Sequence, residues 1–424
     1  MAKKKVERPK DKFTKRQLSR WQQQQRRQRI IMSIGVSVIA VVIGLIIAGI
    51  YYGWYLAEYK PLKQTVIEVN NTKFNMDYYI KTLRHHAGGQ DAQYIEFLLA
   101  PVLESIEQGE LIREKALELG ISISDSAVSD ELDSRELPHN QAVSDIVRTQ
   151  LLFEKLRQEY FDPQLPPSTE QRHIMAMFLE SQSQAAEARV RLETGEDFAQ
   201  LASELSLDSL TKEEAGDLGW RPRGVLEELL DTPLFENFVF DSEVGLLSQP
   251  LYDEDKSKSL GYWLIRVLER DEETEEAHVQ AILLTSWEEA QNTKARLEAG
   301  EDFAQLAGEL SQLPGADENK GDLDWLTPGN MSQAIDDFIF SPETELGIIS
   351  EPIGDETATT NGGYWLFEVL DSGTREISDE DRNSLISKTM NDWLTSLMDD
   401  PENRIVSYLN DEMRAFATSK AQAR

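Results

Sequence analysis

Few side chains in this 424-residue chain are suited to covalent chemistry. Cysteine is absent, which excludes disulfides, thiolate metal sites and a cysteine nucleophile. No Gly-x-x-x-x-Gly-Lys-Ser/Thr loop is present either, so nothing points to a nucleotide. Acidic runs occur at residues 253–255 and 271–273, but with 76 acidic residues in the chain they are expected by chance. The sequence therefore predicts no metal and no cofactor.

The five histidines fall into two groups. His85, His86 and His139 lie in a helical region, and we give them no role. His173 and His278 lie 105 residues apart, at equivalent positions of an internal repeat. Any chemistry is therefore expected in the repeat.

The repeat is long and nearly exact in places. Residues 195–206 (GEDFAQLASELS) and 300–311 (GEDFAQLAGELS) are identical at 11 of 12 positions. The same offset aligns GDLGW at 216–220 with GDLDW at 321–325. Such self-similarity indicates two tandem domains, here copy one (residues 170–270) and copy two (residues 275–371). Each copy reads strand, helix, helix, loop, short helix, strand, with local strand pairing.

Each copy resembles a parvulin-type peptidyl-prolyl isomerase domain. The resemblance implies an α+β fold, with a small antiparallel sheet and helices. In copy one it rests on Arg172-His173-Ile174, the helix at 195–206, Ser206-Leu207-Asp208, GDLGW at 216–220, Phe235 to Phe240, residues 245–250 (GLLSQP) and residues 261–267 (GYWLIRV).

A mostly helical module is predicted for residues 61–162. Asn75 or Asp77 and later Ser124 are plausible helix caps there, because short polar side chains accept the free N–H groups of a first turn. Residues 111–124 are similar to the chaperone part of the foldases SurA and PrsA. The proline-rich stretch at 162–168 predicts a linker. The C-terminal segment, 376–424, is expected to be helical and to pack back on the module.

The net charge of −33 is unevenly distributed. Residues 1–29 hold twelve Lys and Arg against two acidic residues, a charge of +10, so the remainder carries −43. A strongly acidic body repels phosphate backbones, which disfavours nucleic acid as a partner.

An uncharged segment follows the basic tail. Residues 30–57 form an apolar stretch that is long enough to cross a bilayer and ends in an aromatic belt, Tyr51, Tyr52, Trp54 and Tyr55. Basic residues only on the N-terminal side predict a single-pass helix in the cell membrane, with a cytoplasmic N-terminus and an extracytoplasmic body. A cleaved signal peptide is the alternative.

The resemblance also implies a reaction and its residues. The reaction is rotation about an X–Pro amide, whose barrier is about 18–20 kcal/mol, and it requires no cofactor. The family uses two histidines and a Cys or Asp beside an apolar prolyl pocket. Copy one matches with His173 and Asp208 as catalytic residues. Its substrate-binding candidates are Phe235, Trp220, Leu226 (or Leu230) and Trp263.

Both copies depart from this pattern. The second histidine is replaced by Trp263 in copy one and by Trp365 in copy two. Indole is only a donor, so the histidine–histidine network cannot form. Copy two keeps His278 and Met331 but has Leu313 at the Asp position and Ile335 at the Phe position.

Three functions remain open from the sequence. The first is a membrane-anchored parvulin-type foldase that isomerises X–Pro segments of unfolded or nascent secreted polypeptides, or chaperones them. The second is a non-catalytic holdase with degenerate parvulin domains. The third is a structural partner of a membrane complex such as the secretion machinery. The sequence leaves open the clients, the residue preferred before proline and the oligomeric state.

Overall fold

The computed structural model describes residues 15–422. Residues 1–14 of the predicted basic tail and residues 423–424 lie outside the described residues. The chain divides into two compact units, one made of residues 1–160 with 392–424 and the other of residues 161–391. We describe each unit by itself.

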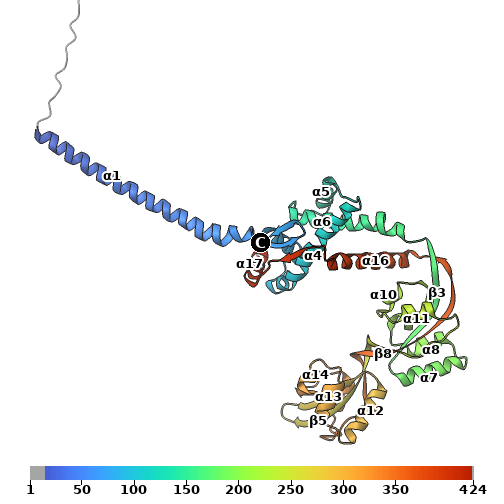
Figure 1. The fold of residues 1–424 in the computed structure, drawn as a ribbon. Helices are drawn as coiled ribbons and strands as arrows, with labels where there is room; N and C mark the ends of the chain where they lie inside the picture. Colours follow the sequence, from blue (N-terminus) through green and yellow to red (C-terminus); the bar gives the residue numbers. More distant parts are fainter. Residues whose placement is uncertain (1–14, 423–424) are drawn as a thin grey trace, which may run out of the picture. The chain divides into compact units, whose positions relative to one another are not determined.

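The first unit begins with a long apolar helix (Figure 1). Helix α1 (Lys15–Ile50) continues into the π-helical η1 (Tyr51–Tyr59) and the short α2 (Lys60–Leu62). Within the described residues, Gln25–Leu62 is the one helix long and apolar enough to cross a membrane, and its most apolar window has no buried residue. This helix fits a membrane anchor or a signal sequence.

The helical module follows. Asn75 caps α3 by accepting a hydrogen bond from the Tyr78 N–H at 3.0 Å, and Ser124 caps α5 in the same way. Helix α4 runs unbroken through Gly109. The elements are β1 (Thr65–Val69), β2 (Thr72–Asn75), α3 (Met76–Ala87), α4 (Ala92–Glu118), α5 (Asp125–Ser134), α6 (Gln141–Leu156) and η2 (Arg157–Phe161).

The C-terminal segment completes the core of this unit. Helix α17 (Asp411–Gln422) packs on α3 and α4, and its Met413 and Ala417 join Tyr79 and Leu83 in one apolar cluster. The sequence missed β9 (Ile405–Ser407), which pairs antiparallel with β1. A three-residue strand has no periodicity of its own, and its partner lies far away in the chain. Helix α16 (Asp379–Asp399) precedes it.

The second unit is built on one antiparallel sheet of six strands in the order β4-β3-β8-β5-β6-β7. Two strands are unusually long, β5 with 21 residues and β8 with 24. The strands are β3 (Ser168–Leu179), β4 (Asp217–Pro222), β5 (Leu251–Asp271), β6 (Glu276–Leu284), β7 (Asp322–Leu326) and β8 (Ile353–Glu376).

Helices cover both faces of this sheet. In copy one, α7 and α8 pack on one face of β3 and β8, and α10 and α11 on the other. Copy two repeats the layers with α12 and α13 opposite α15. The helices are η3 (Asp162–Gln164), α7 (Gln182–Glu193), α8 (Phe198–Leu205), α9 (Ser209–Glu213), α10 (Leu226–Leu230), α11 (Phe235–Asp241), α12 (Trp287–Glu298), α13 (Phe303–Leu310), α14 (Ala316–Asn319) and α15 (Gln333–Ile339).

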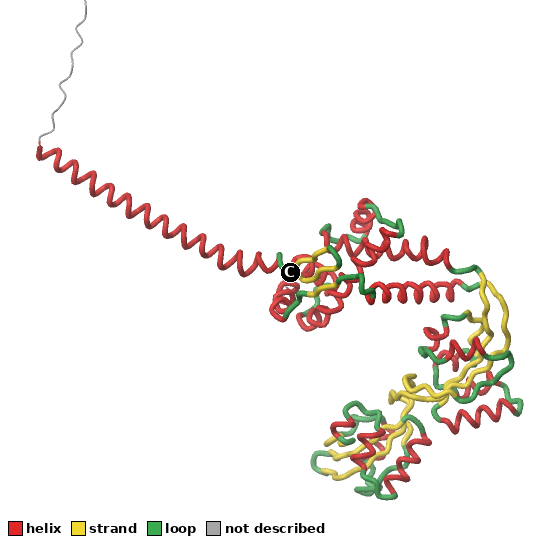
Figure 2. Tube along the Cα trace, viewed as in Figure 1, coloured by secondary structure: helices red, strands yellow, loops and turns green. Residues whose placement is uncertain are grey.

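The two copies exchange their last strands. Strand β8, which ends copy two, pairs with β3 of copy one, with Phe178 opposite Trp365. Strand β5, which ends copy one, pairs with β6 of copy two, with Trp263 opposite Leu283. Figures 1 and 2 show β3 and β8 running side by side.

Local strand pairing within each copy, as predicted, is confirmed for β3 with β4 and for β6 with β7, but it is wrong for the last strand of each copy. The two last strands share the sequence Gly-Tyr-Trp-Leu, so each fits the other copy's sheet as well as its own. The first parts of β5 and β8 do not fold back onto their own copies. They pair with each other as an antiparallel two-stranded ribbon that joins the two copies, with Lys258 opposite Thr360. Exchange of an identical element between two subunits is domain swapping, and here it occurs within one chain.

Candidate functional site

His173 lies on β3 in a small polar and aromatic cluster. Its Nε2 is 2.8 Å from Asp217 Oδ1, and its ring stacks on Trp220 at 5.6 Å between ring centroids. The guanidinium of Arg375 lies 3.5 Å from the centroid of the Trp220 ring, a cation–π contact. The imidazole is thus held by a carboxylate on one nitrogen and by an aromatic face.

Copy two builds the same cluster. His278 Nε2 is 2.8 Å from Asp322 Oδ1, and its ring stacks on Trp325 at 5.6 Å. Partial burial raises the pKa of Asp322, but hydrogen bonds from the Asp324 N–H and from His278 outweigh it and leave the pKa below its ordinary value.

Sequence reasoning missed Asp217 and Asp322. Both are the Asp of the Gly-Asp-Leu motif, and each follows its histidine by 44 residues. That constant spacing was the available signal. The preceding glycine is required: Gly216 has φ of +79°, and a Cβ there would lie 2.9 Å from the Cβ of Ala202.

Asp208, the second predicted catalytic residue, has a structural role in this arrangement. It caps α9 by accepting a hydrogen bond from the Thr211 N–H at 2.9 Å. Its other oxygen lies 3.1 Å from Lys256 Nζ, and both side chains are nearly buried. The hydrogen-bond partner of His173 is Asp217, whereas Asp208 contacts Thr211 and Lys256.

The residues predicted to line a prolyl pocket in copy one are buried together with a tryptophan from the last strand of copy two. Phe235 and Leu226 have no exposed surface, and neither does Trp365, whose ring lies edge-on to Phe235 at 4.9 Å. The Trp365 indole N–H donates to Asp253 at 3.0 Å, and Lys256 lies above the same ring. Leu230, the alternative to Leu226, is in this cluster too.

Copy two has the matching arrangement around Trp263. This side chain packs with Ile335 and Met331, and its indole donates to Asp355 at 3.1 Å. Burial raises the pKa of Asp355, but hydrogen bonds from Thr357 and from the indole outweigh it and leave the pKa below its ordinary value.

The grouping of residues therefore differs from the predicted one. The sequence placed Trp263 with Phe235, but the structure brings Trp365 to Phe235 and takes Trp263 to copy two. The cause is the strand exchange, because each tryptophan travels with its strand. Among the described residues no cluster of three or more His, Asp or Glu is arranged to hold a metal ion.

Comparisons with known proteins agree on the class of protein. The description "PPIC-type PPIASE domain" matches residues 173–269, and a second model with the same description matches residues 262–355. The chain therefore carries two tandem domains that match the parvulin-type family.

Two groups of curated relatives are similar to it. The foldase protein PrsA of Caldanaerobacter subterraneus is 26% identical over 250 residues, covering 55% of this chain and 74% of the relative. The chaperone SurA of Pseudomonas syringae is 28% identical over 234 residues, 50% of each chain. The SurA of Alcanivorax borkumensis is 33% identical over 190 residues, 42% of this chain and 39% of the relative. The chain thus spans about half the length, or less, of these SurA relatives.

Solved structures include the peptidylprolyl isomerase PrsA from Bacillus anthracis. It is 15% identical, covers 76% of this chain and 98% of its own, and has a TM-score of 0.31.

Proposed function

We propose that the protein is a membrane-anchored, extracytoplasmic chaperone that holds unfolded polypeptides, and that its two parvulin-type domains do not isomerise prolyl bonds. The observation that carries this proposal is the position of Trp365. Its buried indole lies edge-on to Phe235, the residue that we predict to line the prolyl pocket, so it supports a pocket closed to substrate.

Free energies favour the filled pocket. Removing a buried tryptophan side chain costs about 3–5 kcal/mol in a protein core. Burying one apolar side chain in its place returns about 1.5–3 kcal/mol. Expelling the indole would also break its hydrogen bond to the buried Asp253. A proline ring is therefore a poor competitor for this space.

The rest of the proposal draws on the apolar helix and on the relatives. Gln25–Leu62 is long enough to anchor the chain in a membrane, and the basic residues before it favour a cytoplasmic N-terminus. The similar proteins are called foldase and chaperone, so unfolded polypeptides are the partner we propose. The third function left open by the sequence, a contact with the secretion machinery, is not part of this proposal.

The full-length chain in lipid nanodiscs tests the proposal. We expect it to suppress the aggregation of an unfolded client protein and to leave the cis/trans exchange of X–Pro peptides at the buffer rate, measured by NMR exchange. Empty nanodiscs are the control. Failure to suppress aggregation would contradict the chaperone function.

A second candidate, weak isomerase activity in copy one, is favoured by the partly exposed His173 beside Asp217. Accelerated exchange that falls in His173→Ala but not in the matched His278→Ala would establish it. The two histidines have the same partners and nearly equal exposure, so a change in folding alone would affect both variants alike.

A further inference from the structure

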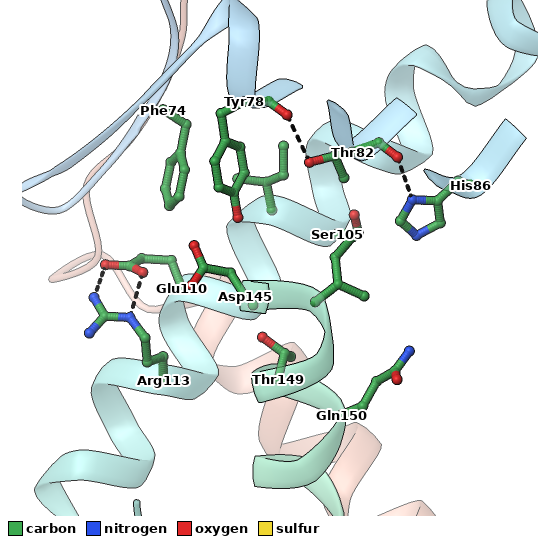
Figure 3. Close-up of a pocket in the computed structure, with 13 residues that line it drawn as sticks. Phe74, Tyr78, Thr82, His86, Ser105, Glu110, Arg113, Asp145, Thr149 and Gln150 are labelled. Atoms are coloured by element: carbon green, nitrogen blue, oxygen red, sulfur yellow. Dashed lines mark hydrogen bonds and ion pairs between the residues drawn. The ribbon is translucent and has the colours of Figure 1, made fainter. Parts of the chain in front are cut away.

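The helical module contains a cavity that plays no part in the parvulin sites. It lies between α3, α4 and α6, and its volume is about 140 Å³ (Figure 3). A second cavity of about 360 Å³ adjoins it and shares Phe74, Glu110, Arg113 and Asp145 in its lining. Together they form a recess that is large enough for an extended side chain.

One part of the wall of this recess is apolar and aromatic. Phe74 from β2 and Tyr78 from α3 form one side, with their rings 4.9 Å apart. Ile106 and Ile146 contribute from α4 and α6. Such a wall suits the aliphatic stem of a long side chain.

One acidic group in the recess already has a cationic partner. Arg113 Nε donates to Glu110 Oε2 at 2.8 Å, and a second bond joins the same two side chains. The Glu110 side chain is 5% exposed. This pair is therefore closed, and neither partner is left to attract a guest.

Asp145 differs from Glu110. It points into the recess beside the hydroxyl of Tyr78 (Figure 3). The nearby guanidinium of Arg148 is engaged elsewhere, with Asp125 Oδ1 at 2.9 Å and the Ile123 carbonyl at 3.1 Å. Burial raises the pKa of Asp145, although the Tyr78 hydroxyl and the two arginines oppose the shift. The carboxylate thus lacks a close ion-pair partner of its own.

We propose that this recess binds the basic side chain, Lys or Arg, of an unfolded polypeptide. The stem packs along Phe74 and Tyr78, and the charged head reaches Asp145. An anionic guest is disfavoured because it would meet the carboxylate of Asp145. This inference rests on the proposed chaperone function and specifies which segments are bound. The strongly acidic body also attracts basic segments over a longer range.

A series of labelled peptides tests the proposal. Each peptide has the same apolar sequence with one central Lys, Arg, norleucine, Gln or Glu, and binding to the full chain in nanodiscs is followed by fluorescence anisotropy. We expect the Lys and Arg peptides to bind about tenfold more tightly than the norleucine peptide. The Glu peptide should bind most weakly.

Asp145→Asn removes the charge but keeps the shape, and it should abolish the preference for Lys and Arg. The matched control is Asp130→Asn, which removes the same charge from an exposed position on α5 of the same module. It should keep the preference.

Each contrary outcome has a distinct meaning. If Lys and norleucine peptides bind equally while the wild-type chain still suppresses aggregation, the inference is overturned and the chaperone function stands. If the Asp145→Asn variant still prefers the Lys and Arg peptides, the inference about the recess is also overturned. If no peptide binds and aggregation is not suppressed, both proposals are overturned.

Discussion

Copy one and copy two share the histidine cluster but differ beside the buried indole. In copy one, an ion pair between Asp208 and Lys256 lies next to Trp365. In copy two, the equivalent positions are Leu313 and Ala358, and both pack in the apolar cluster around Trp263.

This difference separates two kinds of residue. The His–Asp–Trp cluster has nearly the same distances in both copies, as expected for a group that holds the first strand against the second. The residues around the indole differ, although both indoles are buried and both donate to an aspartate. A buried tryptophan thus tolerates either a polar or an apolar neighbour.

The largest expected effect comes from the tryptophans. Trp365→Ala and Trp263→Ala should each lower the free energy of unfolding by about 3–5 kcal/mol, because each leaves a cavity in a core. Because of the strand exchange, Trp365→Ala should loosen β3, α10 and α11 of copy one, and Trp263→Ala should loosen β6 and α15 of copy two. Hydrogen exchange followed by mass spectrometry measures this.

Loss of protection in copy one after Trp263→Ala would contradict the exchange. Each variant is the control for the other, since both remove the same side chain from equivalent positions.

An intermediate effect is expected at the ion pair. Lys256→Ala leaves the nearly buried Asp208 without its cationic partner and should cost about 3 kcal/mol of unfolding free energy. The double variant Asp208→Leu with Lys256→Ala recreates the pairing of copy two and should recover much of that loss. Urea unfolding of both variants measures the coupling, and additive losses would show that the pair does not matter.

The smallest expected effect is a pH dependence of the unfolding free energy that arises from Lys258. Copy two has Thr360 at the equivalent position and cannot contribute it. Burial lowers the pKa of Lys258 in the exchange ribbon to about 8, from 10.5. The folded state therefore loses this proton before the unfolded state does, so stability should rise with pH between about 8 and 10.5. Between pH 7 and 9 the gain should be about 1 kcal/mol.

Lys258→Thr, which copies the opposing Thr360, should remove this rise. Urea unfolding at pH 7 and at pH 9 measures this change in unfolding free energy. Subtracting the change in the variant from the change in the wild type cancels the titration of other groups. An equal rise in the variant would show that Lys258 is not its source.

Much of the fold could be predicted from the sequence, because the relevant signals are local. The apolar segment, the caps at Asn75 and Ser124 and the nearly identical repeat helices each depend on residues within a few positions. The number of domains followed from the repeat and the class of fold from the resemblance of each copy to a parvulin-type domain, and the two matched domains confirm both.

The site could be predicted only in part. The positions of His173 and His278 in the repeat were read correctly, but their aspartate partners lie 44 residues away and depend on strand pairing. The exchange of Trp263 and Trp365 could not be deduced, since the two strands are too similar for sequence to choose between them. Asp208 matched its motif, but its partner Lys256 lies on a ribbon whose course depends on that exchange.

The exchanged strands also affect the order in which the chain can fold during synthesis. A ribosome makes β3 early, but β3 pairs with a strand that is among the last made, with Met177 opposite Leu366. Until that strand emerges, one side of β3 has open backbone groups and the core around Phe178 and Phe235 lacks its indole. Copy one therefore cannot complete its fold until copy two has been made, so the two copies mature as a single unit.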